Sequence, residues 1–107
     1  MITNLTPHEV RVIGEDGEED KVFPPSGQVA RLASVTQGGF ALGGVGMVLE
    51  VEFGKLVDPP PEHLGAYYIV SLPTALAVRR DDFLVPFNEV RDDSGRIIGC
   101  RNLARAL

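Results

Sequence analysis

The order of apolar and polar positions along the chain predicts a mainly β structure. The clearest strand runs from Met47 to Phe53, where Leu49, Val51 and Phe53 fall on one face while Glu50 and Glu52 fall on the other. Such alternation is typical of a strand with one covered face. By the same pattern we expect further strands at 9–13, 21–23, 28–35, 66–71 and 81–86, and a final hairpin that joins 90–91 to 96–98.

Proline and glycine predict where these strands end. The acidic segment 14–20 is polar and carries two glycines, so it is expected to be a solvated hairpin connection. It lacks the downstream glutamate of a calcium loop, which argues against a calcium site. Residues 24–27 break the chain, residues 58–62 form a stiff proline linker, and residues 92–95 form a turn. The glycine-rich segment from Gln37 to Gly46 has no phosphate-loop ending, so we expect a mobile hairpin or an oligomer-contact loop that presents Phe40 and Leu42 to a partner.

One short α-helix is predicted near residues 73–80. Ser71 can cap it and Pro73 suits its first turn. With 107 residues, the whole chain 1–107 is expected to form a single β-rich domain, as a β-barrel or as a β-sandwich. The residue pattern leaves those two architectures open.

Composition indicates a cytoplasmic protein without a membrane segment. No apolar run approaches the length of a transmembrane helix, and the start of the chain lacks the features of a signal peptide. Cys100 is the single cysteine, which we expect to face the core. His8 and His63 have no second nitrogen or sulfur ligand at metal-site spacing, and no nucleophile elbow surrounds any serine. We therefore expect no metal, no cofactor and no enzymatic activity.

The charge of the chain is unevenly distributed. The net charge of −5 argues against binding to a nucleic acid polymer. Residues 79–107 nevertheless hold six arginines and no lysine. These arginines either pair with neighbouring aspartates or bind a small anionic, nucleotide-like ligand, with a tyrosine as stacking face. The candidate ligand-binding residues are Arg79, Arg80, Arg91, Arg96, Arg101, Tyr67 and Tyr68.

Several segments of the chain resemble a family of small proteins found in bacteriophages and bacterial genomes. The resemblance is carried by residues 4–8, 23–27, 29–31, 68–71, 80–86, 90–92 and 95–101. It implies no catalytic residues, because the family is known to us only as uncharacterised. Small phage proteins often act by blocking a host protein or by sequestering a host nucleotide signal, so the resemblance favours a binding function.

Two hypotheses of function follow. The first is a non-enzymatic homo-oligomer that binds a small anionic or nucleotide-like ligand through the arginines after residue 78. The alternative is a protein-interaction or structural module that inhibits or assembles with a host or phage protein through Phe40, Leu42 and exposed strand edges.

Overall fold

The computed structural model describes all residues from Met1 to Leu107, and most of its regular structure is β. The strands are β1 (Ile2–Asn4), β2 (Val10–Val12), β3 (Lys21–Phe23), β4 (Arg31–Leu42), β5 (Gly46–Val57), β6 (Tyr67–Ile69), β7 (Phe83–Arg91) and β8 (Ile97–Ala104). The one helix, α1, spans Leu72–Val78. It is short, and the structure contains no helix long and apolar enough to cross a membrane.

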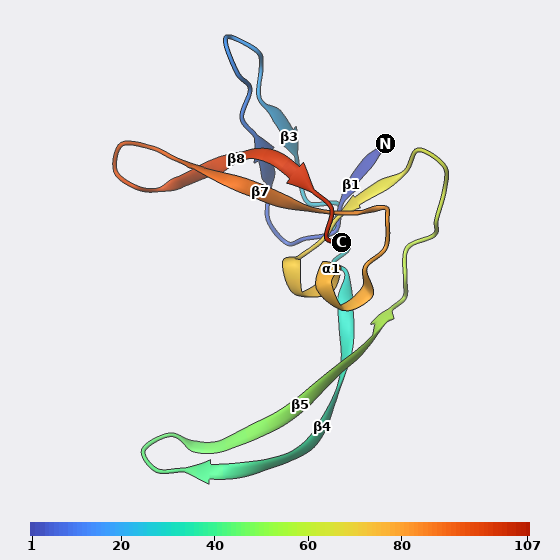
Figure 1. Cartoon of the computed structure of the whole chain (residues 1–107), viewed down its shortest axis with the longest axis vertical. Helices are drawn as coiled ribbons and strands as arrows, with labels where there is room; N and C mark the ends of the chain where they lie inside the picture. The colour runs from blue at the N-terminus through green and yellow to red at the C-terminus, as the bar shows by residue number, and fades with distance from the viewer.

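Six strands form the body of the molecule (Figure 1). Their order is β1-β6-β7-β8-β2-β3, and the sheet curls into a nearly closed, barrel-like form. The pairs β1–β6, β6–β7 and β2–β8 are parallel, whereas β7–β8 and β2–β3 are antiparallel. The predicted mainly β fold with one short helix is confirmed. Of the two architectures that the sequence left open, a barrel and a sandwich, the structure has the barrel-like one.

Asn4 joins the two edges of this sheet. Its side chain, in strand β1, donates to the backbone oxygens of His8 and Phe23 at 2.7 and 2.9 Å and accepts from the backbone N–H of Thr6 at 2.9 Å. The backbone oxygen of Asn4 accepts from Ser26 at 3.0 Å. Because Asn4 is only 2% exposed, these bonds satisfy a polar group that water does not reach.

The core of the body is small. Eleven of 107 residues are buried, and the largest fully buried side chains are Phe83, Ile69 and Val70. Tyr68 packs edge-on against Phe83 with 6.4 Å between ring centroids. The apolar cluster is completed by Leu5, Ala75 and Val85. Strands β6 and β7 and the helix thus supply most of the hydrophobic core.

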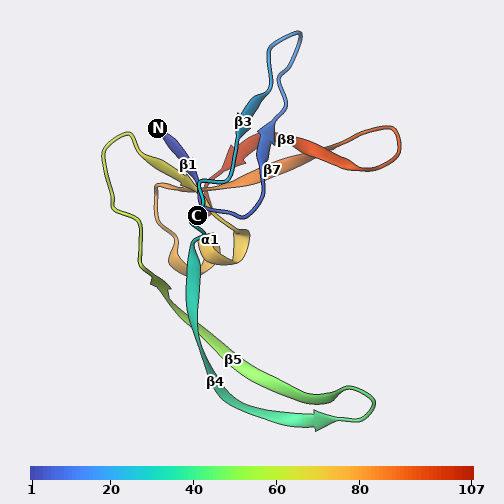
Figure 2. The ribbon, with the colours of Figure 1, turned by 180° about the vertical axis from the view of Figure 1, so that it is seen from behind.

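Strands β4 and β5 pair only with each other and project from the body as a long, bent hairpin, here called the arm (Figures 1 and 2). The radius of gyration is 17.0 Å, whereas a compact chain of this length has about 13 Å. Of the two forms expected for residues 37–46, a hairpin and a loop, the structure has the hairpin, and its strands run further than expected, to Leu42 and again from Gly46. Pairing keeps Gly38 and Gly39 within the strand, and the chain turns at the tip, where Gly44 and Gly46 have φ of +82° and +109°.

Several other elements differ from the sequence prediction. Strand β8 runs to Ala104, beyond the expected end at residue 98. Strand β1 was not predicted, since three residues carry little periodicity and its parallel partner β6 begins at Tyr67. Strand β7 continues through Pro86, where the prediction ended it. Strand β6 pairs only with Phe83 and Leu84, so one side of β7 has no partner at Pro86, and proline is tolerated there. Helix α1 begins as expected, with Ser71 as cap, and ends at an Arg79 in the left-handed conformation.

We expect Asn4→Ala to destabilise the protein by about 2–4 kcal/mol, because it removes three partly buried hydrogen bonds, to His8, Phe23 and Thr6. Thermal unfolding followed by circular dichroism measures the loss. Asn102→Ala is the matched control, since Asn102 is exposed and its side chain bonds only Asn88. Equal midpoints for the two variants would contradict the role assigned to Asn4.

Candidate functional site

Arg80, one of the candidate ligand arginines, is bound within the body. Its guanidinium donates to both carboxylate oxygens of Asp82 at 2.9 and 2.6 Å and to the backbone oxygen of Pro60 at 2.8 Å. Only 14% of its side chain is exposed. The hydrogen bond to Asp82 raises the pKa of Arg80 above its usual value, followed in size by the opposing effect of burial. Arg80 therefore serves as a structural cation in this chain.

The two tyrosines next to each other on β6 have different environments. Tyr68 is buried, and its hydroxyl donates to the backbone oxygen of Pro61 at 2.7 Å. The guanidinium of Arg80 lies 4.6 Å from the ring centroid of Phe83 and 6.0 Å from that of Tyr68. Together Tyr68 and Arg80 hold the proline linker against the body. Tyr67 is 37% exposed, so of the two it is the one that offers surface to a ligand.

The remaining candidate arginines lie apart from Arg80. Arg79 donates to the backbone oxygen of Leu107 at the C-terminus. Arg91 pairs with Glu89 at 3.1 Å and donates to the backbone oxygen of Gly95 at 2.8 Å. The ion pairs of the structure use Arg11, Arg80 and Arg91, so Arg96 and Arg101 have no acidic partner. The single chain thus does not gather the candidate arginines and tyrosines in one pocket.

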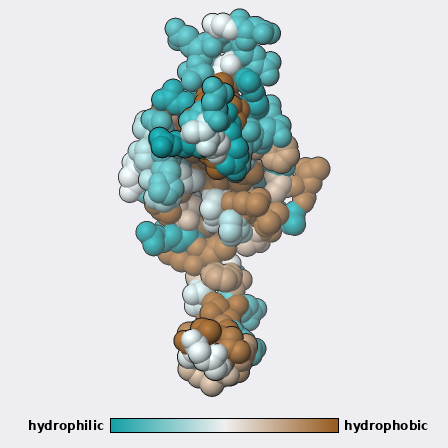
Figure 3. All heavy atoms as spheres, turned by 90° about the vertical axis from the view of Figure 1, so that its left-hand side faces the viewer, coloured by the Kyte–Doolittle hydropathy of each residue, from teal (hydrophilic) through white to brown (hydrophobic).

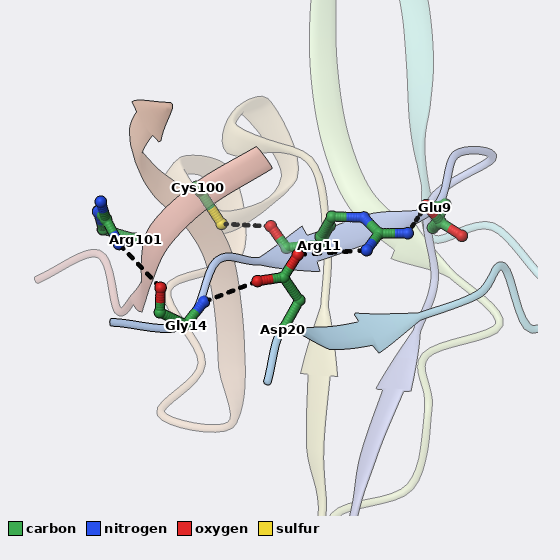
Figure 4. Close-up of polar contacts among 6 residues, drawn as sticks. All are labelled: Glu9, Arg11, Gly14, Asp20, Cys100 and Arg101. Carbon is green, nitrogen blue, oxygen red and sulfur yellow. Dashed lines mark hydrogen bonds and ion pairs between the residues drawn. The ribbon is translucent and has the colours of Figure 1, made fainter. Parts of the chain in front are cut away.

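Arg101 lies at the seam between β8 and β2 (Figure 4). It donates to the backbone oxygen of Gly14 at 3.2 Å. Asp20 accepts from the N–H of Gly14 at 2.9 Å and pairs with Arg11 at 3.3 Å. The bond from Gly14 is the main cause that lowers the pKa of Asp20 below its usual 3.8, and the positive charges of Arg11 and Arg101 lower it further. Beside this network, the thiol of the buried Cys100 contacts the backbone oxygen of Arg11 at 3.5 Å.

Phe40 and Leu42, the candidate partner contacts, both lie on strand β4 of the arm. They are 50% and 48% exposed and lie opposite Val48 and Gly46 of β5. Apolar residues gather over the arm at the lower end of Figure 3, whereas the β2–β3 connection at its upper end is hydrophilic.

Hollows surround the base of the arm. One of about 630 Å³ lies between the arm and α1 and is lined by Arg31, Phe53 and Leu76. A second, of about 600 Å³, lies under the proline linker and also includes Arg31. Sequence reasoning did not select Arg31, because a single arginine in an alternating strand gives no signal. The sequence pattern places Phe53 on an apolar face, but it does not show whether another part of the protein covers that face.

Comparison with protein-family models, with curated proteins and with solved structures finds no match to this chain. The structure contains no group of three or more histidine, cysteine or acidic side chains placed to hold a metal ion.

We expect Arg80→Lys to lower stability by about 2 kcal/mol, because lysine cannot reproduce the paired bonds to Asp82. The bond to Pro60 depends on the same planar fork of donors. Chemical denaturation measures the change. Arg79→Lys is the control, because Arg79 lies next to Arg80 in the chain and is exposed. An unchanged unfolding midpoint in Arg80→Lys would contradict the structural role of Arg80.

The lowered pKa of Asp20 predicts a local effect of acid. A carboxylate with a depressed folded-state pKa stabilises the fold above the unfolded value and loses that contribution as pH falls through the folded value. We expect the amide resonance of Gly14 to titrate with a midpoint below 3.8. NMR spectra between pH 6 and pH 2 follow it, and Asp20→Asn removes the titration. A midpoint at or above 3.8 would contradict the assignment.

Proposed function

We propose that this chain is a non-enzymatic, homo-oligomeric binding protein that takes up a small anionic, nucleotide-like ligand. The observation that carries the proposal is the arm, which displays large apolar side chains away from the body. Met47, Leu49 and Phe53 are 63%, 57% and 65% exposed, and Val45 at the tip is 72% exposed. Apolar surface gathered in this way marks an interaction site.

The arm also needs a partner for its own stability. A two-stranded hairpin is only marginally stable in water. Fully burying one large apolar side chain stabilises by about 1.5–3 kcal/mol. Covering four half-exposed residues on each of two copies therefore contributes about 6–12 kcal/mol, which is comparable with the estimated 4–15 kcal/mol cost of association. Assembly through the arm is thus energetically reasonable.

Charge supports an anionic ligand. Arg96 and Arg101 have no acidic partner, although the chain as a whole is acidic. An arginine that forms no ion pair with a carboxylate keeps guanidinium donors available for a phosphate or carboxylate. Tyr67 adds an exposed aromatic face of the type on which a base stacks. Arg80 and Arg91 pair with carboxylates and Arg79 bonds the C-terminal residue. We assign the ligand contact first to Arg96, and then to Arg101, which keeps donors beyond the one that bonds the backbone oxygen of Gly14.

Two measurements test this function. Light scattering after gel filtration should give a mass that is a multiple of 11.5 kDa. Calorimetry against cyclic nucleotides, ADP-ribose-type nucleotides and inorganic phosphate should show heat with at least one nucleotide. We expect Arg101→Ala to weaken that binding about tenfold, the usual effect of losing one charge-assisted hydrogen bond.

Lys21→Ala is the matched control, because it removes the same charge from an exposed position on β3. It should leave the ligand affinity unchanged. Folded protein that is monomeric at micromolar concentration, or that gives no heat with any of these ligands, would refute the proposal.

The alternative, a module that captures another protein, is favoured by Phe40 and Leu42, which are exposed on β4 near the tip. Under that hypothesis, removal of residues 37–46 abolishes capture of the partner while the body, which has its own core, keeps its thermal stability.

A further inference from the structure

The hollow of about 600 Å³ under the proline linker plays no part in the function proposed above. We call it the linker hollow. It is the most enclosed of the larger hollows, and its volume falls within the range of about 300–1,000 Å³ that is usual for small-molecule sites. Its walls come from β1 and β6, from the base of the arm, and from the linker, which runs as an extended segment between β5 and β6 (Figure 1). A single chain therefore supplies the whole cavity.

Hydrogen bonds hold the walls of the linker hollow in place. The hydroxyl of Tyr68 and the guanidinium of Arg80 donate to backbone oxygens of the linker at 2.7 and 2.8 Å. At the base of the arm, the backbone N–H of Ala30 donates to the backbone oxygen of Leu5 at 3.0 Å. Both movable walls are thus tied to the body. A ligand that enters a cavity held in this way does not have to order it first.

Two charged side chains line the linker hollow, one of each sign. Arg31 is the first residue of β4, and Asp58 directly follows Val57, the last residue of β5, which lies opposite Arg31 in the strand register. Although Arg31 and Asp58 share the hollow, the ion pairs of the structure use neither of them. A guanidinium and a carboxylate that line one cavity without pairing leave both charges available to a ligand.

The two sides of the hollow differ in the hydrogen bonds that they can make. Proline has no backbone N–H, so the linker residues 59–61 can accept hydrogen bonds but not donate them. Asp58, at the start of the linker, also only accepts when it is ionised, whereas the guanidinium of Arg31 only donates. The other polar side chains of the lining, Thr3 and Gln28, are neutral and can do either. The hollow therefore has a side that suits an ammonium group and a side that suits a carboxylate.

Apolar surface lies between these polar groups. Leu5, Val29 and Val57 line the same hollow, and Val29 and Val57 are 37% and 48% exposed. A ligand with an apolar side chain would cover this surface and gain the free energy of its burial.

We propose that the linker hollow binds a small zwitterion with an apolar side chain, a free amino acid or a dipeptide, with its carboxylate on Arg31 and its ammonium group on Asp58. This site lies apart from the contact assigned to Arg96 and Arg101. It is complete in one chain, so it requires neither the homo-oligomer nor the nucleotide-like ligand.

The presence of both charges determines which ligands the hollow accepts. A nucleotide brings phosphates but no ammonium group, so Asp58 repels it while Arg31 attracts it. A simple amine meets the reverse combination. Only a molecule that carries both charges satisfies both side chains, which makes the linker hollow selective for zwitterions.

Calorimetry at pH 7 tests the ligand class. Leucine and leucyl-leucine are the probes, and each is compared with its N-acetylated form, which lacks the ammonium group, and with its C-terminal amide, which lacks the carboxylate. We expect heat with at least one of the two zwitterions. Each blocked form of that zwitterion should bind at least about tenfold more weakly, the effect of losing one charge-assisted hydrogen bond.

Two substitutions assign the two charges. Arg31→Gln should weaken the zwitterion about tenfold without further weakening its amide, and Asp58→Asn should do the same without further weakening the N-acetylated form. Asp58 has a left-handed φ of +46°, which asparagine adopts as readily as aspartate, so Asp58→Asn should keep the circular dichroism of the unaltered protein. Arg105→Gln and Asp93→Asn are the matched controls, because both residues are exposed and neither lines the hollow. They should leave the affinity unchanged.

The outcomes separate this site from the proposed function. Folded protein that gives no heat with either zwitterion, that binds a blocked form equally well, or that keeps its affinity in Arg31→Gln or Asp58→Asn would overturn the zwitterion site alone. Arg101→Ala should leave zwitterion binding unchanged. Absence of nucleotide binding together with normal zwitterion binding would refute the proposed function and leave this site in place.

Discussion

The side chain of Asn4 is the constraint on which the body depends. A curled sheet with two open edges exposes rows of unpaired backbone groups, and barrels remove them by closure. Here the amide of Asn4 in β1 reaches the backbone of Phe23 in β3, which joins the first and last strands of the sheet order. This bond brings the sheet close to closure. Exposed apolar side chains remain on the body, for example Phe87 and Ile97 at 55% and 50%, as well as on the arm.

The division of apolar residues between body and arm sets what the chain can do. The core is built around Phe83, Ile69 and Val70, and only eleven residues are buried. The large apolar residues of strand β5, namely Met47, Leu49, Val51 and Phe53, lie outside that core. A sequence that keeps large apolar side chains out of a small core loses hydrophobic stabilisation unless another surface covers them. Under the proposed function, the arm is half of an interface.

Local patterns predicted the local structure, and long-range contacts limited the rest. The alternation from Met47 to Phe53 and the Ser71 cap are local signals, and both elements form. Glycine misled the prediction at 37–46, because its low strand propensity is overcome when a partner strand pairs with it along its length. For the candidate site, the sequence could not distinguish a structural arginine from one available to a ligand. Arg80 pairs with Asp82, whereas Arg101 forms no ion pair and bonds only a backbone oxygen. That distinction depends on burial, which only the fold determines.

The positions of Arg96 and Arg101 connect the ligand hypothesis to assembly. They are five residues apart, and at about 3.3 Å per residue an extended chain separates their backbones by about 16 Å. None of the larger hollows of the single chain is lined by either arginine. In a homo-oligomer, an arginine of one copy can lie across from the equivalent arginine of another, which brings two guanidinium groups together without any change within either chain. Under the proposed function, the ligand site is thus a property of the assembly, and the arm that assembles the copies also determines whether the arginines can cooperate.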